Sequence, residues 1–188
     1  TFDSNFHFSY DYNWYGSQDG LIVRGGVNHS KVYGNTFSDW GHSALNCTVL
    51  KYTSTGVFNN EFYNNDFTFE NISYGRALDV NAGTATTGEW TYNNSFYNNH
   101  IIGQLTRSQI GGTDNVYLRN IWENSRKETA FDDPVIRNQV FAFRSNIVTK
   151  NNRFAHNIIY RADCIGVDFR PGGALAGTNT GNAVEYNF

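Results

Sequence analysis

The chain has 188 residues, the length of one ordinary domain, and charged and aromatic residues each make up 16% of it. Charged residues are therefore scarcer than in an average soluble protein, whereas asparagine reaches about one residue in seven. The formal net charge of −3 gives no reason to expect a nucleic-acid partner, and no apolar run is long enough for a membrane span.

One short sequence pattern recurs along the whole chain and predicts a repeat protein. A β-branched or small residue is usually followed by an aromatic residue, then by asparagine and by a second large aromatic residue. The clearest copies are 32–37, 57–62 and 91–96, and looser copies occupy 116–122, 148–154 and 183–188. The aromatic residues that close successive copies are 25, 34, 26, 32 and 34 residues apart.

This variable spacing favours a right-handed parallel β-helix, in which short strands stay constant while the loops between them change length. We expect an all-β solenoid of about six coils with three short strands in each. In the best-preserved coil the strands are predicted at 21–24, 31–33 and 36–38, with a sharp bend at Asn35. Asparagine suits that bend because it enters the left-handed backbone region more readily than other residues that carry a side chain.

Coils stacked about 4.8 Å apart would also bring equivalent side chains into contact along the helix axis. We therefore expect a hydrogen-bonded asparagine ladder at the bends. An internal aromatic ladder is expected from the closing residues of the repeats, which are Phe37, Phe62, Phe96, Trp122, Phe154 and Phe188. A leucine-rich repeat would need a regular period and a leucine framework, and a β-sandwich would need hairpins, so both fit the sequence less well.

The first strand of each coil carries the residues of chemical interest. These strands are expected at 21–24, 44–47, 77–80, within 104–110, and at 141–144 and 165–169. Alternation places the apolar residues inside and directs the polar ones outward, beside the small residues Ala44, Ala77, Ala142 and Gly166. The sequence thus predicts one shallow groove, walled by the loops 40–42 and 126–134. Its predicted polar residues are Arg24, Asn46, Asp79, Arg107, Arg144 and Asp168.

The repeated Asn-Asn-x-Phe turns, the three strands per coil and this polar face resemble the right-handed β-helix carbohydrate-active proteins, the pectate lyase-like superfamily. The resemblance covers nearly the whole chain and concerns its architecture. A narrower similarity is to the disaggregatase-related domain of archaeal cell-surface proteins, enzymes that cleave a chondroitin-like matrix. The resemblance implies a secreted or cell-surface protein that acts on an acidic polysaccharide, and we expect it to be a monomer.

Hydrolysis of such a polymer would need two carboxyl groups roughly 5–9.5 Å apart. We expect Asp79 to pair with Asp132 or Asp133, with His42 as a further catalytic candidate. Asp168 would lie too far from Asp79, at roughly 14 Å, to complete such a pair. The predicted substrate-binding residues are Arg24, Asn46, Arg76, Arg107, Arg144 and Asp168, with Trp40 as a stacking platform.

Two other hypotheses remain at this point. A lyase would use Arg107, Arg144 or His42 as the base or as the cation that neutralises the uronate carboxylate. A non-catalytic sugar-binding or structural β-helix module is the third hypothesis, because both chain ends fall within the repeat and the single domain would then be excised from a larger surface protein. No cofactor is required, although clustered carboxylates are able to hold Ca²⁺.

The two cysteines test the fold assignment. Cys47 belongs to the second predicted coil and Cys164 to the sixth, so their separation should be roughly 19 Å at ordinary strand spacing. A disulfide needs Cα atoms within about 7 Å. We therefore predict two free thiols, with Cys47 buried.

Overall fold

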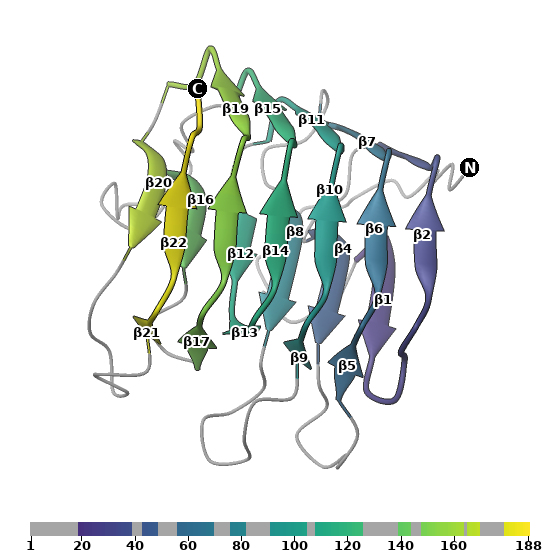
Figure 1. Cartoon of the computed structure of the whole chain (residues 1–188). Helices are drawn as coiled ribbons and strands as arrows, with labels where there is room; N and C mark the ends of the chain where they lie inside the picture. The colour runs from purple at the N-terminus through teal and green to yellow at the C-terminus, as the bar shows by residue number, and fades with distance from the viewer. Residues whose placement is uncertain are drawn as a thin grey trace, which may run out of the picture.

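The computed structural model describes residues 19–38, 43–48, 56–69, 76–81, 91–104, 108–125, 139–143, 148–163, 165–169 and 179–188. All the strands in these ranges pair in parallel with strands of neighbouring coils and build four sheets (Figure 1). No described helix is long and apolar enough to cross a membrane.

The first two sheets contain the strands that open each coil. Sheet A comprises β1 (Leu21–Arg24), β4 (Ser43–Thr48), β8 (Arg76–Asn81), β12 (Ser108–Ile110), β16 (Gln139–Phe143) and β20 (Ile165–Phe169). Sheet B comprises the two-residue strands β5 (Val57–Phe58), β9 (Thr91–Tyr92), β13 (Gly112–Thr113), β17 (Thr149–Lys150) and β21 (Asn179–Thr180).

The other two sheets follow the asparagine turns. Sheet C comprises β2 (Lys31–Tyr33), β6 (Glu61–Tyr63), β10 (Ser95–Tyr97), β14 (Val116–Leu118), β18 (Arg153–Ala155) and β22 (Ala183–Glu185). Sheet D comprises β3 (Thr36–Ser38), β7 (Asp66–Thr68), β11 (His100–Ile102), β15 (Ile121–Glu123) and β19 (Ile158–Tyr160).

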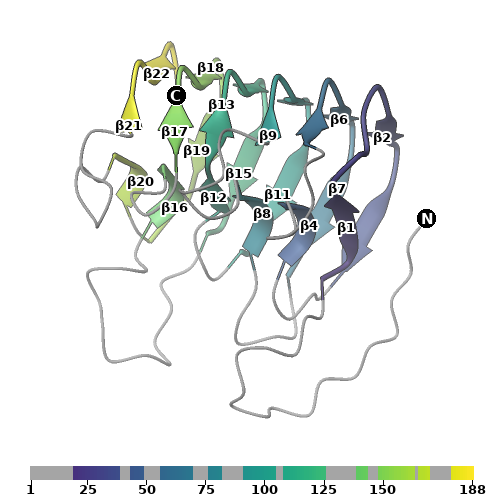
Figure 2. The same cartoon turned by 90° about the horizontal axis from the view of Figure 1, so that it is seen from below.

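The coil is right-handed. In Figure 1 the chain ascends in sheet C at the front, crosses at the top through sheet D, descends in sheet A behind and advances from right to left. This is the hand that connections between parallel strands almost always take. The view from below in Figure 2 shows the coils following one another from β1 at one end to β22 at the other.

The parallel β-helix expected from the sequence is thus confirmed, and the three strands predicted for the first coil have the predicted bounds. The structure adds the short strands of sheet B as a fourth strand in most coils. The added strands explain why the sequence pattern recurs so often: each coil contains two asparagine turns rather than one. The turns join sheet B to sheet C and sheet C to sheet D, and their asparagines are five residues apart, as Asn60 and Asn65 illustrate.

Two asparagine ladders run along the helix axis at these turns. At most steps the side-chain Oδ1 accepts hydrogen bonds from the backbone N–H and the Nδ2 of the preceding rung; Asn65, for example, donates both bonds to Asn99 at 3.1 and 3.0 Å. At the step from Asn115 to Asn152 only the backbone N–H donates to Oδ1, and the Asn115 Nδ2 donates to the carbonyls of Thr91 and Gly111 instead. One ladder joins Asn60, Asn94, Asn115, Asn152 and Asn182, and the other joins Asn35, Asn65, Asn99, Asn120, Asn157 and Asn187.

The backbone conformation at the turns corrects the sequence prediction. Asn35 and the other ladder asparagines are not in the left-handed region. The residue before each of them adopts it instead, as Gly34 does with φ 64° and Asn64 with φ 52°. One asparagine was expected both to make the bend and to form the ladder. In the structure two consecutive residues share these tasks: the first makes the turn and the second forms the ladder.

The predicted stacking of aromatic residues in the interior is confirmed, but the stacked rings are divided between two sheets. Phe62, Phe96 and Tyr117 stack inside sheet C with ring centroids 4.8 Å apart, and Phe154 occupies the next rung of that sheet. Phe37 and Trp122 belong to sheet D instead, where Phe37 stacks on Phe67. Phe188, at the last coil, is 85% exposed and is not part of the core. The single ladder predicted from the sequence therefore merged two parallel ones.

Sheet A supplies the rest of the core. Val23, Leu45, Cys47, Leu78 and Val80 point inward as alternation predicts, and each is buried in one hydrophobic cluster with the aromatic residues. Cys47 is a free, buried thiol, as predicted, and burial raises its pKa above the ordinary value. Cys164 lies outside the described residues.

Candidate functional site

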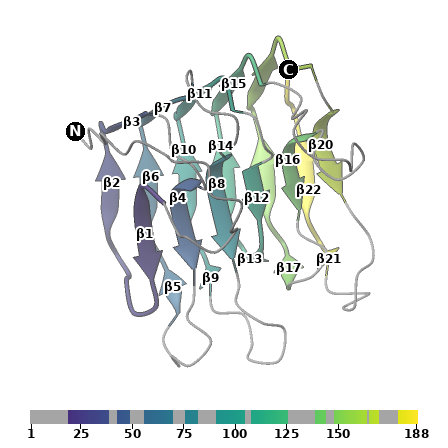
Figure 3. The ribbon, with the colours of Figure 1, turned by 180° about the vertical axis from the view of Figure 1, so that it is seen from behind.

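The outward row of sheet A is the place where the sequence predicts chemistry. The strand register aligns Ile22, Asn46, Asp79, Gln109, Ala142 and Asp168 in one row across the sheet. Figure 3 shows the strands of this sheet side by side from behind the molecule. The inward neighbours of Asp79 are the core residues Leu78 and Val80, so the predicted register is correct.

The predicted exposure of Asp79 is wrong. Its side chain is buried, with a relative exposure of 5%, and Arg76 is buried beside it at 8%. The Arg76 Nη1 donates to Asp79 Oδ2 at 2.6 Å and to Gln109 Oε1 at 3.3 Å. The two charges and the amide thus form a buried, hydrogen-bonded polar group in the middle of the row rather than the floor of an open groove.

The physical reason is that alternation determines the direction of a side chain but not what surrounds it. The small neighbours Ala44, Ala77 and Ala142 are themselves buried, although they point outward. The Arg76 guanidinium and the Asp79 carboxylate compensate each other's charge, so the pair tolerates burial that an isolated charge would not.

The strand next to Asp79 is also irregular. β12 pairs with β8 only at Gln109 and Asp79, and side chains replace the missing ladder bonds. The backbone N–H of Leu78 donates to Ser108 Oγ, and that of Ala77 donates to Gln104 Oε1, each at 3.3 Å. This buried hydroxyl–amide pair lies in the segment 104–110, where the sequence predicts a strand without defined bounds.

Asn46 and Arg24 are the other candidates of this sheet whose side chains the structure describes. Asn46 is half-buried, its Nδ2 donates to Asp19 Oδ2 at 2.8 Å, and its Oδ1 has no hydrogen-bond partner among the described residues. Arg24 is exposed, as predicted, but it lies two strands away from Asp79 and two residues further along. At ordinary spacings that is about 12 Å, so the structure does not bring Arg24 to the Asp79 group.

Most of the loop candidates lie outside the described residues, namely Trp40, His42, Arg107, Asp132, Asp133 and Arg144. For Asp168 the backbone alone is described; it is three strands from Asp79, about 14 Å, as expected. No group of three or more His, Cys, Asp or Glu side chains able to hold a metal ion occurs in the described ranges, and Ca²⁺ binding stays a prediction.

The outer face of sheet C has features that the sequence analysis did not single out. Tyr33, Tyr63 and Tyr97 stack in a column along the helix axis, with ring centroids 5.0 and 4.8 Å apart. The Tyr97 hydroxyl donates to Glu61 at 2.7 Å, and Lys31 pairs with the same carboxylate at 3.2 Å. The hydrogen bond from Tyr97, followed by that from Lys31, lowers the pKa of Glu61.

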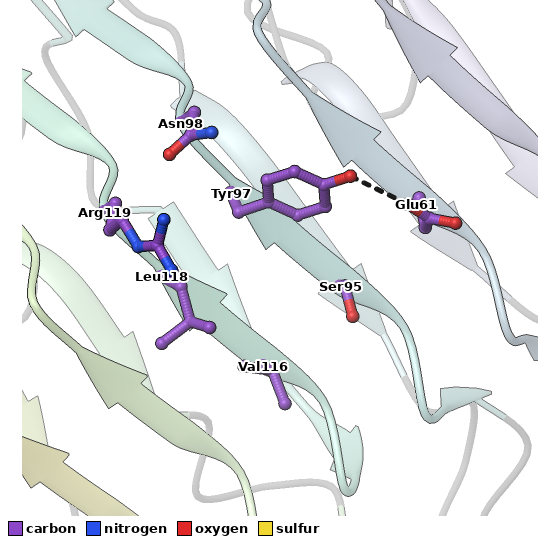
Figure 4. Close-up of a pocket in the computed structure, with 7 residues that line it drawn as sticks. All are labelled: Glu61, Ser95, Tyr97, Asn98, Val116, Leu118 and Arg119. Carbon is purple, nitrogen blue, oxygen red and sulfur yellow. Dashed lines mark hydrogen bonds between the residues drawn. The ribbon is translucent and has the colours of Figure 1, made fainter.

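The tyrosine column ends at a groove. The register continues from Tyr97 to Leu118 and then to Ala155, so the large rings give way to shorter side chains. The resulting hollow has a volume of about 310 Å³ and is lined by Glu61, Ser95, Tyr97, Asn98, Val116, Leu118 and Arg119 (Figure 4). The signal in the sequence is a tyrosine two residues before the ladder asparagine, at Tyr33, Tyr63 and Tyr97, and it becomes visible once both turns of every coil are aligned.

Comparisons of the chain with protein-family models, with curated proteins and with solved structures found no match.

Proposed function

We propose that this chain cleaves an acidic, uronic-acid-containing polysaccharide of chondroitin-like type at the outward row of sheet A. The observation that supports the proposal is the buried Arg76–Asp79 pair, with 2.6 Å between Nη1 and Oδ2. A buried ion pair is a poor way to stabilise a fold, because the desolvation of both charges offsets their attraction. A buried charged pair that stabilises the fold so little is a candidate for a functional role.

The arrangement suits Asp79 for the role of base or nucleophile. Arg76 and its bond to Gln109 hold the carboxylate in one orientation, as a group that accepts a proton or attacks carbon requires. Hydrolysis further needs an acid that protonates the glycosidic oxygen while water or Asp79 attacks the anomeric carbon. Asp132 and Asp133 are our candidates for the acid, since Asp168 is about 14 Å away along the row.

The burial of the Arg76–Asp79 pair also favours a second function, binding without catalysis. Asp79 is already bonded to Arg76 and is 5% exposed, which leaves little of its carboxylate for a substrate. The chain would then be a non-catalytic β-helix module that binds polysaccharide without cutting it. Cleavage by β-elimination is the third option, with His42, Arg107 or Arg144 in the roles of base and carboxylate partner.

The test uses a panel of uronic-acid polysaccharides and follows new reducing ends and the near-ultraviolet absorbance of unsaturated uronate. The double variant Arg76→Gln/Asp79→Asn removes both charges together, so neither charge of the pair is left buried opposite a neutral partner. We expect it to fold and to lose on the order of a hundredfold or more in turnover.

The matched control is Arg153→Gln/Glu185→Gln, which neutralises an exposed ion pair of sheet C with 2.9 Å between its charged atoms. This control should retain full turnover. A folded Arg76→Gln/Asp79→Asn variant with full turnover would exclude Asp79 from catalysis. Binding of the polymer without new ends in the wild type would favour the module, and unsaturated products would identify a lyase.

A further inference from the structure

The groove at the end of the tyrosine column offers both apolar and charged surface. Val116 and Leu118 are half-buried, and Tyr97 adjoins them across the strand pair β10–β14. In Figure 4 the Tyr97 hydroxyl points toward Glu61, while Leu118 and Arg119 lie on the opposite side of the ring. An aromatic ring beside aliphatic side chains is a surface on which the apolar face of a sugar ring packs.

The charges around the groove favour an anionic ligand. Glu61 is neutralised by Lys31 and also accepts the Tyr97 hydroxyl. Arg119, in contrast, has no ion-pair partner among the described residues, and neither the side-chain amide of Asn98 nor the Ser95 hydroxyl has a described hydrogen bond. The groove therefore presents one uncompensated guanidinium with an amide and a hydroxyl nearby, which suits a carboxylate on a polyhydroxylated ring.

The backbone at Arg119 determines how its side chain reaches the groove. Arg119 occupies the turn position with φ 52°, where the preceding coils have Gly34, Asn64 and Asn98 and the following coils have His156 and Tyr186. Arginine is disfavoured in this left-handed region, whereas glycine and asparagine enter it readily. The turn leaves the Arg119 side chain exposed directly after β14, where it contributes the cation of the groove.

We propose that this groove binds a uronate residue of an acidic polysaccharide. The carboxylate pairs with Arg119, the ring packs on Tyr97 and Leu118, and hydroxyl groups bond to Asn98 and Ser95. The groove lies on sheet C, across the solenoid from the Asp79 row of sheet A (Figures 1 and 3). The inference shares its class of polymer with the proposed function but depends on none of the same residues, so it describes a second site that holds the chain rather than cutting it.

The test compares an unsulfated chondroitin tetrasaccharide with its carboxyl methyl ester, which keeps the shape and removes the charge. Binding is measured by NMR chemical-shift titration and calorimetry, and the ligand is checked afterwards for cleavage. The variant is Arg119→Asn, which introduces the residue type that Asn64 and Asn98 provide at the equivalent turns of the preceding coils. We expect it to melt no lower than the wild type and to bind the acidic tetrasaccharide at least about tenfold more weakly.

Arg161→Asn is the matched control, because Arg161 has the same φ of 52°, and the change removes the same charge at a turn where the guanidinium lies over Tyr160, 4.8 Å from the ring centroid. It should bind like the wild type. The methyl ester should bind both variants and the wild type equally and weakly. Equal binding of acid and ester, equal losses in the two variants, or no shift of groove signals at millimolar ligand would each overturn the proposal.

Failure of this site is distinguishable from failure of the catalytic proposal. The Arg76→Gln/Asp79→Asn variant should lose cleavage and keep the binding that depends on Arg119. Arg119→Asn should lose this binding and still cleave the tetrasaccharide at saturating concentration. Loss of both properties in either single experiment would contradict the existence of two separate sites.

Discussion

At the scale of single residues, the network around Glu61 shows how an exposed face acquires a defined shape. Tyr97 is the last ring of the tyrosine column and the wall of the groove, and its hydroxyl bond to Glu61 fixes the ring across two strands. Desolvation, and then the bond to Glu61, raise the pKa of Tyr97 to about 12. The same bond lowers the pKa of Glu61, and the bond to Glu61 raises the pKa of Lys31.

The first prediction concerns the titration of this network. A raised tyrosine pKa means that Tyr97 stabilises the folded state up to about pH 10 and that this contribution disappears as the pH rises toward 12. The lowered pKa of Glu61 has the opposite sense, so its contribution is present above about pH 4.3 and is lost as the pH falls through the folded value. Glu61→Gln should therefore lower the Tyr97 pKa part of the way only, because desolvation remains the larger cause.

The measurement is a 13C NMR titration of the tyrosine ring carbons, with the Tyr97 signal assigned by its disappearance in Tyr97→Phe. An unchanged Tyr97 pKa in Glu61→Gln would contradict the hydrogen bond. The acid limb of the stability curve should also become flatter in Glu61→Gln, which a series of urea unfolding curves between pH 3 and 7 detects.

At the scale of elements, the turn pairs divide two tasks between neighbouring residues. Asn64 has φ 52° and an exposed side chain, whereas Asn65 is buried. The Asn65 Nδ2 donates to the Val32 carbonyl at 3.0 Å, and its Oδ1 accepts the backbone N–H of Asn35 at 3.1 Å. The ladder residue thus satisfies backbone groups of the preceding coil, and the turn residue supplies only a conformation.

The second prediction separates these tasks with two neighbouring substitutions. Asn65→Ala leaves the Val32 carbonyl and the Asn35 N–H without their partners and should lower the free energy of unfolding by about 2–4 kcal/mol. Asn64→Gly keeps a residue that enters the left-handed region freely and should change it by less than about 1 kcal/mol. Urea denaturation followed by circular dichroism measures both; equal losses would mean that the ladder contributes no more than the turn.

The same elements explain what the sequence could and could not reveal. Strand positions such as Lys31–Tyr33 were predictable because alternation and flanking turn residues act locally. The merged aromatic ladder arose because the turns at Asn60 and Asn65 have almost the same local sequence, Asn-Asn-Glu-Phe and Asn-Asn-Asp-Phe. The five-residue interval between them was the available signal.

The candidate site was less predictable than the strands. The outward direction of Asp79 followed from alternation, but its burial depends on contacts with Arg76 and Gln109 that pairing across strands creates. The groove at Tyr97 depends on a change from tyrosine to leucine between two coils, at Leu118. That change has meaning only when the register between coils is known, and variable loops conceal the register in the sequence.

At the scale of the whole molecule, each coil contacts only its neighbours, so stability accumulates along one axis. The central strands of every sheet pair on both sides, as β10 does with β6 and β14. β20, β21 and β22 pair on one side only in this chain. In the last coil the inward position of sheet C is also less buried, since Val184 occupies the place of the aromatic residues and is 37% exposed.

The third prediction follows from this asymmetry. Stacked rings such as Phe62 and Phe96 each contribute about 0.5–1.5 kcal/mol beyond their burial, and the central coils have such contacts above and below. We therefore expect backbone amides of β6, β10 and β14 to exchange with solvent deuterium most slowly, and those of β20–β22 to exchange through a local opening of lower free energy. Native-state exchange in low urea, read by NMR or by mass spectrometry of peptides, provides the comparison.

The variant Asn65→Ala sharpens this comparison, because a chain that opens coil by coil should show faster exchange in β2, β6 and β10 while the exchange of β22 stays unchanged. If instead all amides, including those of β22, share one free energy of opening and shift together in the variant, the solenoid unfolds as a single cooperative unit and the nearest-neighbour description fails.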